Sequence, residues 1–245
     1  IAPLWSGASE WGLHFGERLF WWVHILGIFA FLNYLPYSKH FHIILAFPNT
    51  YYANLEAKGR FENNAAVTKE VALMMDPSAD PFAAPAPDAD APIERFGAKD
   101  ANDLSWTNLL NAYTCTECGR CTSECPANLT GKKLSPRKIM MDTRDRIEEI
   151  GQNIATNGSF LDDGKSLLGD YITNEELWAC TSCNACVQAC PVDIDPLNII
   201  MKLRNFATME ESSAPGALNA MMTNVENNGA PWPFNQMDRA NWINE

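Results

Sequence analysis

Two stretches decide the fold of this chain: CTECGRCTSECP at residues 115–126 and CTSCNACVQACP at residues 180–191. Both follow the pattern C-x-x-C-x-x-C-x-x-x-C-P, and all eight cysteines of the 245-residue chain lie within them. A [4Fe-4S] cluster needs thiolates that converge from several directions, and two-residue gaps let one tight turn place three of them around a cluster. The sequence therefore predicts two [4Fe-4S] clusters and an electron-carrying protein.

The cysteine before each proline is expected to ligate the cluster of the other motif. Cluster 1 would then be held by Cys115, Cys118, Cys121 and Cys190. Cluster 2 would be held by Cys180, Cys183, Cys186 and Cys125. Two other interpretations stay open. A disulfide framework is one, but it is typical of small secreted domains. Structural zinc is the other, but a zinc ion takes four ligands, which leaves the spacing of the third cysteine and the cysteine-proline step unexplained.

Composition and charge exclude some other classes. The formal net charge of -12 argues against a nucleic-acid partner, which needs a basic face. No P-loop or G-x-G-x-x-G stretch indicates a nucleotide site. The length allows one large or two modest domains. Because the first residue is Ile1 and no signal-peptide pattern precedes the first apolar run, we expect a longer chain that continues upstream.

The N-terminal part predicts a membrane segment. A short amphipathic lead, Leu4 to Glu17, precedes the run Leu19 to Leu35, in which only His24 and Asn33 are strongly polar. The length of this run is at the lower limit for a membrane-spanning helix, and a buried core helix is the alternative. Aromatic residues at both ends are typical of membrane interfaces: Trp21, Trp22, Tyr34 and Tyr37. The basic residues that follow the run place its C-terminal end and the clusters on the cytoplasmic side: Lys39, Lys58 and Arg60.

Histidines in and after the apolar run are candidate haem ligands. If the helix continues through Pro36, His24 and His42 lie five turns apart on one face, roughly 27 Å along the axis, whereas His40 faces away. Such spacing suits two haems near opposite sides of a bilayer about 30 Å thick. A histidine hydrogen-bonded at the interface is the simpler alternative for each, and Pro36 weakens the geometry because it can kink the helix.

Residues 22–42 resemble the last membrane helix of the cytochrome b subunits of the respiratory nitrate reductase gamma type. That family includes the membrane subunits of heterodisulfide reductase, and its last helix supplies one histidine to each of two haems b. The resemblance implies a remnant of a cytochrome b helical bundle at residues 1–48. It also implies His24 and His42 as axial ligands, with the partner histidines supplied by missing helices or another subunit.

Beyond the membrane segment we expect a mainly α protein in three parts. Residues 49–103 are predicted to connect the membrane helix to the clusters, ending in a Pro/Ala/Asp-rich linker at 76–103. Residues 104–210 would form the cluster domain and 211–245 a partner-docking segment. Helices are predicted before Cys115, from Pro136 to Ile150, after Thr173, from Leu197 to Phe206, and from Ala214 to Asn228. A basic patch would act as counter-charge or docking surface: Lys132, Lys133, Arg137 and Lys138.

The cluster region resembles the alpha-helical ferredoxin domain, because helices flank both cysteine motifs. That fold occurs in the iron-sulfur subunits of succinate dehydrogenase, anaerobic glycerol-3-phosphate dehydrogenase and heterodisulfide reductase. The segment Ala230-Pro231-Trp232-Pro233 is similar to the one that leads into the CCG domains of heterodisulfide reductase catalytic subunits. Those domains are missing, so disulfide chemistry is not assigned to this chain.

Together these features predict an electron-transfer subunit of a respiratory oxidoreductase complex in the bacterial inner membrane. It would relay electrons between a cytoplasmic partner, either a CCG-domain or a flavoprotein subunit, and haem b and quinone in the membrane. Two alternatives remain: a subunit that contributes directly to a heterodisulfide-reductase-like catalytic site, and a haem-free ferredoxin tethered to the membrane. No free cysteine, flavin motif or acid-base group supports the first of these.

Overall fold

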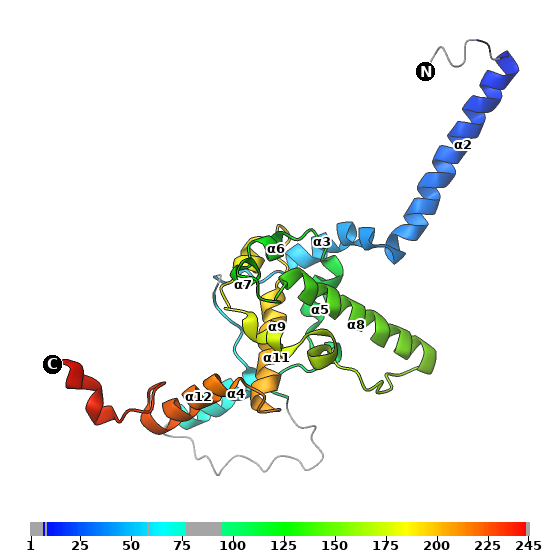
Figure 1. Cartoon of the computed structure of the whole chain (residues 1–245). Coiled ribbons are helices and arrows are strands. Elements are labelled where there is room, and N and C mark those ends of the chain that lie inside the picture. The colour runs from blue at the N-terminus through cyan, green and yellow to red at the C-terminus, as the bar shows by residue number, and fades with distance from the viewer. Residues whose placement is uncertain (1–6, 8, 58, 77–94, 244–245) are drawn as a thin grey trace.

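The computed structural model describes residue 7 and residues 9–57, 59–76 and 95–243, and it confirms a mainly α fold (Figure 1). Within these ranges no strand is formed, and one isolated bridge joins Leu168 to Ile172. The elements are α2 (Glu10–Tyr34), η1 (Leu35–Tyr37), η2 (Lys39–Phe41), α3 (His42–Tyr51), α4 (Ala65–Met75), η3 (Ala101–Asp103), α5 (Trp106–Thr114), α6 (Arg120–Ser123), α7 (Pro126–Leu129), α8 (Pro136–Asn157), η4 (Leu167–Tyr171), α9 (Asn174–Ala179), α10 (Ala185–Gln188), α11 (Pro196–Met209), α12 (Gly216–Asn228) and η5 (Gln236–Ile243).

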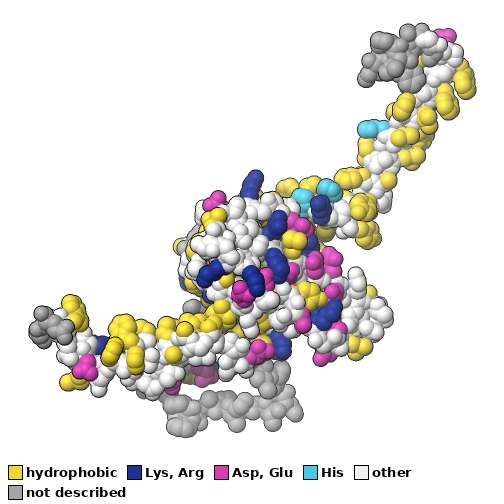
Figure 2. All heavy atoms as spheres, in the orientation of Figure 1, with side chains coloured by type: hydrophobic (Ala, Val, Ile, Leu, Met, Phe, Trp, Pro, Cys, Tyr) yellow, Lys and Arg dark blue, Asp and Glu magenta, His cyan; other side chains and the backbone are white. Residues whose placement is uncertain are grey.

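Helix α2 extends away from the rest of the described chain and carries apolar side chains along its length (Figures 1 and 2). It begins after Ser9, whose hydroxyl accepts a hydrogen bond from the Gly12 N–H at 3.2 Å. None of its residues is buried, and its length and composition would allow it to cross a membrane. The predicted run Leu19 to Leu35 is therefore the apolar part of a longer helix. That helix takes in the described part of the amphipathic lead, whereas residues 1–6 and 8 lie outside the described residues.

The chain bends sharply after α2, at a segment that we call the hinge, residues 35–41. Pro36 lies in the one-turn helix η1, and Ser38 then adopts an extended conformation with φ -118° and ψ 161°. The Ser38 hydroxyl accepts a hydrogen bond from the His40 N–H at 3.3 Å and so caps a new turn. The prediction that one helix aligns His24 with His42 over five turns is therefore wrong, because proline and an N-capping serine end that helix.

Helix α3 packs on the cluster domain along α5. Asn49, which is buried in α3, donates a hydrogen bond from its side chain to the carbonyl of Val192 at 2.8 Å. The ring of Tyr52 meets the ring of Trp106 edge-on at 4.8 Å between centroids. The boundary that we placed between residues 48 and 49 thus falls inside a helix that rests on the cluster domain.

The core of the cluster domain is formed by α5, α8, α9 and α11 around the two cysteine loops. Arg146 of α8 is completely buried and bonds to Asp100 at 2.7 Å and to Asp163 at 2.6 Å, an arrangement that raises its pKa. Ala98, also fully buried, donates its N–H to the Lys202 carbonyl at 3.1 Å. Residues 95–103 therefore pack against the cluster domain, with Ala98 and Ala101 buried, which corrects the predicted end of the linker. Residues 77–94 of that linker lie outside the described residues.

The predicted helix starts are confirmed by their caps. Thr173 and Glu176 form the capping box that opens α9. Proline occupies the first position of both α8 and α11, behind Ser135 and Asp195, each of which accepts a backbone hydrogen bond three residues on. Local signals were sufficient at these positions because each cap is satisfied within one turn.

Candidate iron-sulfur centre

The two cysteine motifs adopt the same loop. Cys115 directly follows α5 and Cys180 directly follows α9, so a helix delivers the first cysteine of each motif. Two residues of each loop then take the left-handed conformation, at Glu117 and Gly119 in the first and at Ser182 and Asn184 in the second. A short helix follows in each case, α6 and α10. This path curls the chain around the space that the first three cysteines enclose.

The first loop faces a cavity of about 100 Å³. Its wall includes all four cysteines predicted for cluster 1: Cys115, Cys118, Cys121 and Cys190. Cys186 also reaches it, and the remaining walls are largely apolar, with Met140 and Ile194 among them. The structure therefore brings two cysteines of the second motif, Cys186 and Cys190, to the first loop.

The second loop faces a narrower cavity of about 10 Å³. The four cysteines predicted for cluster 2 line it: Cys125, Cys180, Cys183 and Cys186. Leu197 and Ile200 of α11 close its far side. In the described part of the chain, no three His, Cys, Asp or Glu side chains surround one position suited to a single metal ion. The cysteines instead line two adjacent cavities that share Cys186.

Most of the cysteine side chains are shielded from solvent, and this changes their acidity. Burial raises the pKa of Cys115, Cys121 and Cys180, and it raises the pKa of Cys186 to about 12, with Cys180 adding to the effect. These thiols are therefore protonated at neutral pH until metal binds, and metal binding must release their protons. The Ser182 N–H lies 3.4 Å from the Cys180 sulfur and can donate to it, as backbone amides do toward cluster sulfurs. The donor set and its burial fit [4Fe-4S] ligation.

Arg204 of α11 holds the second loop. Its guanidinium donates to the carbonyl of Leu177 at 2.8 Å, to the carbonyl of Cys180 at 2.5 Å and to the Ser182 hydroxyl at 3.2 Å. It also lies over the Trp178 ring, 5.0 Å from its centroid. Burial lowers the pKa of Arg204, yet a guanidinium stays charged at neutral pH. A positive charge is thus fixed beside the second cavity.

The first loop is held differently. Arg144 of α8 donates to the Glu117 carboxylate at 2.7 Å, and Thr122 shares a hydrogen bond with Ser135 at 2.9 Å. The positive charge of Arg144 is therefore compensated by a residue of the loop that it supports.

The members of the predicted basic patch have different surroundings. Lys133 pairs with Glu175 at 2.6 Å, and Lys138 pairs with Asp142 at 2.7 Å and Glu176 at 2.9 Å. Arg137 lines the first cysteine cavity, and Lys132 is exposed. A role of the patch as counter-charge or docking surface stays a prediction.

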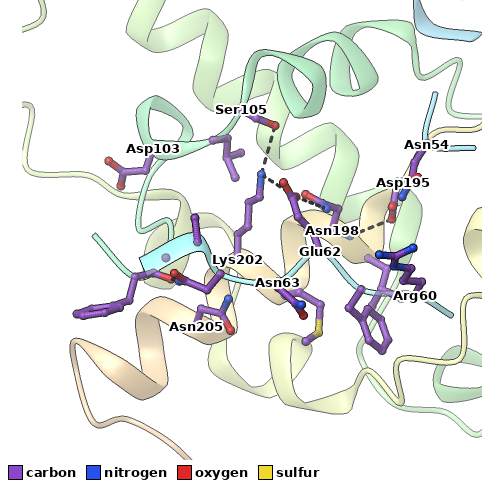
Figure 3. A pocket seen from close by; sticks show the side chains of 18 of the residues that line it. Asn54, Arg60, Glu62, Asn63, Asp103, Ser105, Asp195, Asn198, Lys202 and Asn205 are labelled. Atoms are coloured by element: carbon purple, nitrogen blue, oxygen red, sulfur yellow. Dashed lines mark hydrogen bonds and ion pairs between the residues drawn. The ribbon is translucent and has the colours of Figure 1, made fainter. Parts of the chain in front are cut away.

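A polar cavity of about 390 Å³ lies beside the second loop (Figure 3). Lys202 occupies its centre and donates to the Asn108 side-chain oxygen at 3.0 Å and the Ser105 hydroxyl at 3.3 Å, with Glu62 at 3.7 Å. Asn198 donates in turn to Glu62 at 3.1 Å. These contacts connect residues 60–64 and 95–105 to α11. The polar side chains of the cavity therefore stabilise the fold of the cluster domain.

The candidate haem ligands lie outside the cysteine centre. His24 is exposed on α2, and His42 is the first residue of α3, with its Nδ1 2.6 Å from the Lys39 carbonyl oxygen. The His42 and His40 rings are 6.4 Å apart. The structure does not place His24 and His42 on a common helical face, and their role as haem ligands stays a prediction.

Sequence reasoning missed Arg204, Asn49 and Arg146. Arg204 lies on the same face of α11 as the buried residues Leu197 and Ile200. A cation on the apolar face of a helix that follows a cysteine motif could have indicated a contact with the cysteine loop. Asn49 and Arg146 act on partners far away in the sequence, and no local pattern identifies them.

Residues 114–194 match the family model of the 4Fe-4S dicluster domain, which contains both motifs. This match agrees with the cavities and favours iron-sulfur clusters over zinc or disulfides as the occupants of the eight cysteines.

Relatives extend the likeness to the rest of the chain. A probable iron-sulfur-binding oxidoreductase of Bacillus subtilis is 31% identical over 100% of this chain and 36% of its own length. The EtfAB:quinone oxidoreductase of Syntrophomonas wolfei is 29% identical over 94% of this chain and 31% of its own length. A probable membrane-anchored ferredoxin of Chromohalobacter salexigens is 32% identical over 63% of this chain and 25% of its own length. The chain thus spans about a third of these relatives or less.

Heterodisulfide reductase C subunits match the cluster domain and its surroundings, as that of Methanosarcina acetivorans does with 31% identity over 106 residues. The expected likeness to iron-sulfur subunits is therefore confirmed, whereas none of these names mentions a cytochrome b. The chain carries a 4Fe-4S dicluster domain at residues 114–194 and is similar over nearly its whole length to a probable iron-sulfur-binding oxidoreductase and to a quinone oxidoreductase.

Proposed function

We propose that this chain relays electrons in a membrane-bound respiratory oxidoreductase complex, between a cytoplasmic partner and an acceptor in the membrane. The observation that carries the proposal is the pair of adjacent cavities, each lined by the four cysteines predicted for one cluster. The docking of α3 supports it, because Asn49 joins the membrane-side segment to Val192, two residues after Cys190.

The residues divide into two ligand sets. Cys115, Cys118, Cys121 and Cys190 would hold cluster 1, and Cys180, Cys183, Cys186 and Cys125 would hold cluster 2. When bound, each [4Fe-4S] cluster supplies a site that gains or loses one electron. The walls of both cavities are largely apolar, although Cys118 and Cys183 are exposed, and the Ser182 N–H lies within reach of the Cys180 sulfur.

The proposed setting is the bacterial inner membrane, with α2 spanning it and the cluster domain on the cytoplasmic side. The exposed apolar face of α2 and its flanking tyrosines support this placement. A flavoprotein or CCG-domain subunit is the proposed partner. Large apolar side chains exposed in residues 211–245 support a docking role for that segment, among them Trp232, Phe234 and Trp242.

A second candidate adds haem b to the membrane side, with His24 and His42 as axial ligands. The position of His24 inside an apolar helix supports it, because polar residues within a span are rarely without a role. Quinone would then be the membrane-side acceptor, as the name of the Syntrophomonas relative suggests for that protein.

The test is anaerobic purification, in mild detergent, of the complex that contains this chain, followed by iron and sulfide analysis, electron paramagnetic resonance (EPR) and a pyridine haemochrome assay. We expect about eight iron and eight sulfide per chain and two [4Fe-4S] signals. A single zinc ion, or cysteines paired in disulfides, would overturn the proposal. Loss of haem in His24→Ala and His42→Ala, with His14→Ala as the matched control, would support the haem assignment. Two clusters without haem would leave a tethered ferredoxin.

A further inference from the structure

A groove lies where the hinge meets the cluster domain, and we call it the hinge groove. It encloses about 940 Å³ between residues 36–45 on one side and helices α5 and α8 on the other. Cys115 forms part of its wall and also lines the first cysteine cavity. A molecule in the hinge groove would therefore touch a ligand of cluster 1.

We propose that the hinge groove binds the headgroup of a neutral, lipid-soluble quinone. This inference rests on the proposed function, because it names the membrane-side reaction partner of cluster 1. The volume is within the range of small-molecule sites, which are about 300–1,000 Å³. No relative's name assigns a position to such a ligand.

The walls suit a flat conjugated ring with an apolar tail. Phe41 and Leu45 line the groove from the hinge side, and Leu109, Leu110 and Ile147 line it from the cluster domain. Two donors on the wall already have acceptors, since Ser38 donates to the Leu35 carbonyl at 3.0 Å and Arg144 to Glu117 at 2.7 Å. The polar atoms of a quinone are its carbonyl oxygens, and these could accept from the other donors of the wall: Tyr37, Lys39, Tyr113 and Gln152.

The charge of the groove disfavours an anionic ligand. Lys39 and Arg144 are opposed by three carboxylates, those of Glu117, Asp145 and Glu148. Arg144 is already paired with Glu117 at 2.7 Å. Haem propionates or a phosphate would therefore meet a net negative surface, whereas a neutral quinone would not. Neither His40 nor His42 lines the groove, so it is distinct from a haem bound through them.

The position of the groove also fits a ligand that arrives from the bilayer. The hinge follows α2 directly, and Tyr34 and Tyr37 are largely exposed at this point, as residues at a membrane interface are. A ligand dissolved in the bilayer would reach the hinge before the rest of the cluster domain.

A large side chain at position 151 would fill part of the groove. Gly151 lies on the exposed side of α8, lines the groove, and a Cβ added there would meet no atom within 4 Å. Gly151→Leu should therefore fold well, since leucine also favours helix more than glycine does. Gly216→Leu in α12 is the matched control, because its Cβ would likewise meet open space, far from the groove in sequence. Ala155→Leu, also on the groove wall, is the second variant.

The experiment labels the cluster-loaded full chain in detergent with a short-tailed photoreactive azido-benzoquinone and maps the labelled peptides by mass spectrometry. We expect label on α5 and α8, displaced by an unlabelled naphthoquinone. Gly151→Leu and Ala155→Leu should each reduce it about tenfold, the effect of about 1.4 kcal/mol of lost binding. Gly216→Leu should label like the wild type, and all four proteins should show both cluster signals by EPR. Bound quinone should perturb the signal of cluster 1 and leave that of cluster 2 unchanged.

Equal labelling of wild type and Gly151→Leu, or labelling confined to other peptides, would overturn the inference. A chain that does not bind two clusters would instead refute the proposed function. Two intact clusters with no label on α5 or α8 would refute the groove alone.

Discussion

The two cysteine loops follow the same backbone path but are held in place by different side chains. In the first, Arg144 meets the carboxylate of Glu117. In the second, Arg204 meets carbonyl oxygens of the chain itself, and among the described residues no carboxylate pairs with it. The shared path fixes where the cysteines lie, whereas the two arginines set different electrostatic surroundings for two otherwise similar clusters. A fixed cation without a carboxylate partner favours the reduced, more negative state of a cluster, so Arg204 should raise the reduction potential of cluster 2 more than Arg144 raises that of cluster 1.

Replacing the fourth cysteine of either motif by alanine should have the largest effect on cluster content. Cys190→Ala should remove or convert cluster 1 and spare cluster 2, because Cys190 lines the cavity of the first loop. Cys125→Ala should do the reverse. Each variant should lose up to about four iron atoms per chain, measured by iron analysis, with one EPR signal retained. If each substitution affected the cluster of its own motif, the two loops would be independent units and the ligand sets would be wrong.

Removing the two arginines tests the electrostatic difference. Arg204→Met should lower the reduction potential of cluster 2 by about 60 mV, the equivalent of a tenfold change in equilibrium constant for one electron. Arg144→Met, the matched control, should shift cluster 1 much less, because Glu117 already compensates its charge. Redox titration followed by EPR measures both potentials. Arg204→Lys keeps the charge, so the potential of cluster 2 should fall less in this variant than in Arg204→Met. Equal shifts in Arg204→Met and Arg144→Met would contradict the proposed electrostatic difference between the loops.

The smallest effect concerns the left-handed residue that follows the second cysteine of each loop. Gly119 has φ 84° and Asn184 has φ 60°. Gly119→Ala should lower the free energy of unfolding by about 1–2 kcal/mol, because a Cβ is strained in that region. Asn184→Gly should change it by less than about 0.5 kcal/mol, since the backbone loses no permitted conformation. Urea unfolding of the anaerobic, cluster-loaded proteins measures both; a larger loss for Asn184→Gly would mean that its side chain has a further role.

The cysteine sets and most helices could be predicted because their signals are local. Spacing of cysteines, prolines at first helical positions and the Thr173–Glu176 box each act within a few residues. A kink at Pro36 was considered from the sequence, whereas the extended conformation of Ser38 and the new cap it forms are revealed only by the backbone. Arg146 and Asp100 are 46 residues apart in sequence, and residues 95–103 look like linker until that ion pair draws them into the core. Arg204 was missed for the same reason, since its partners are carbonyl oxygens that every sequence contains.

The hydrogen bond from Asn49 to Val192 has a consequence for biogenesis. Val192 follows the Cys190-Pro191 step, so ligation of cluster 1 by Cys190 would restrain the carbonyl that Asn49 binds. Iron insertion would then tighten the contact between α3 and the cluster domain, which the Tyr52–Trp106 ring contact also supports. Loading of the clusters and attachment of the membrane-side segment would therefore mature together.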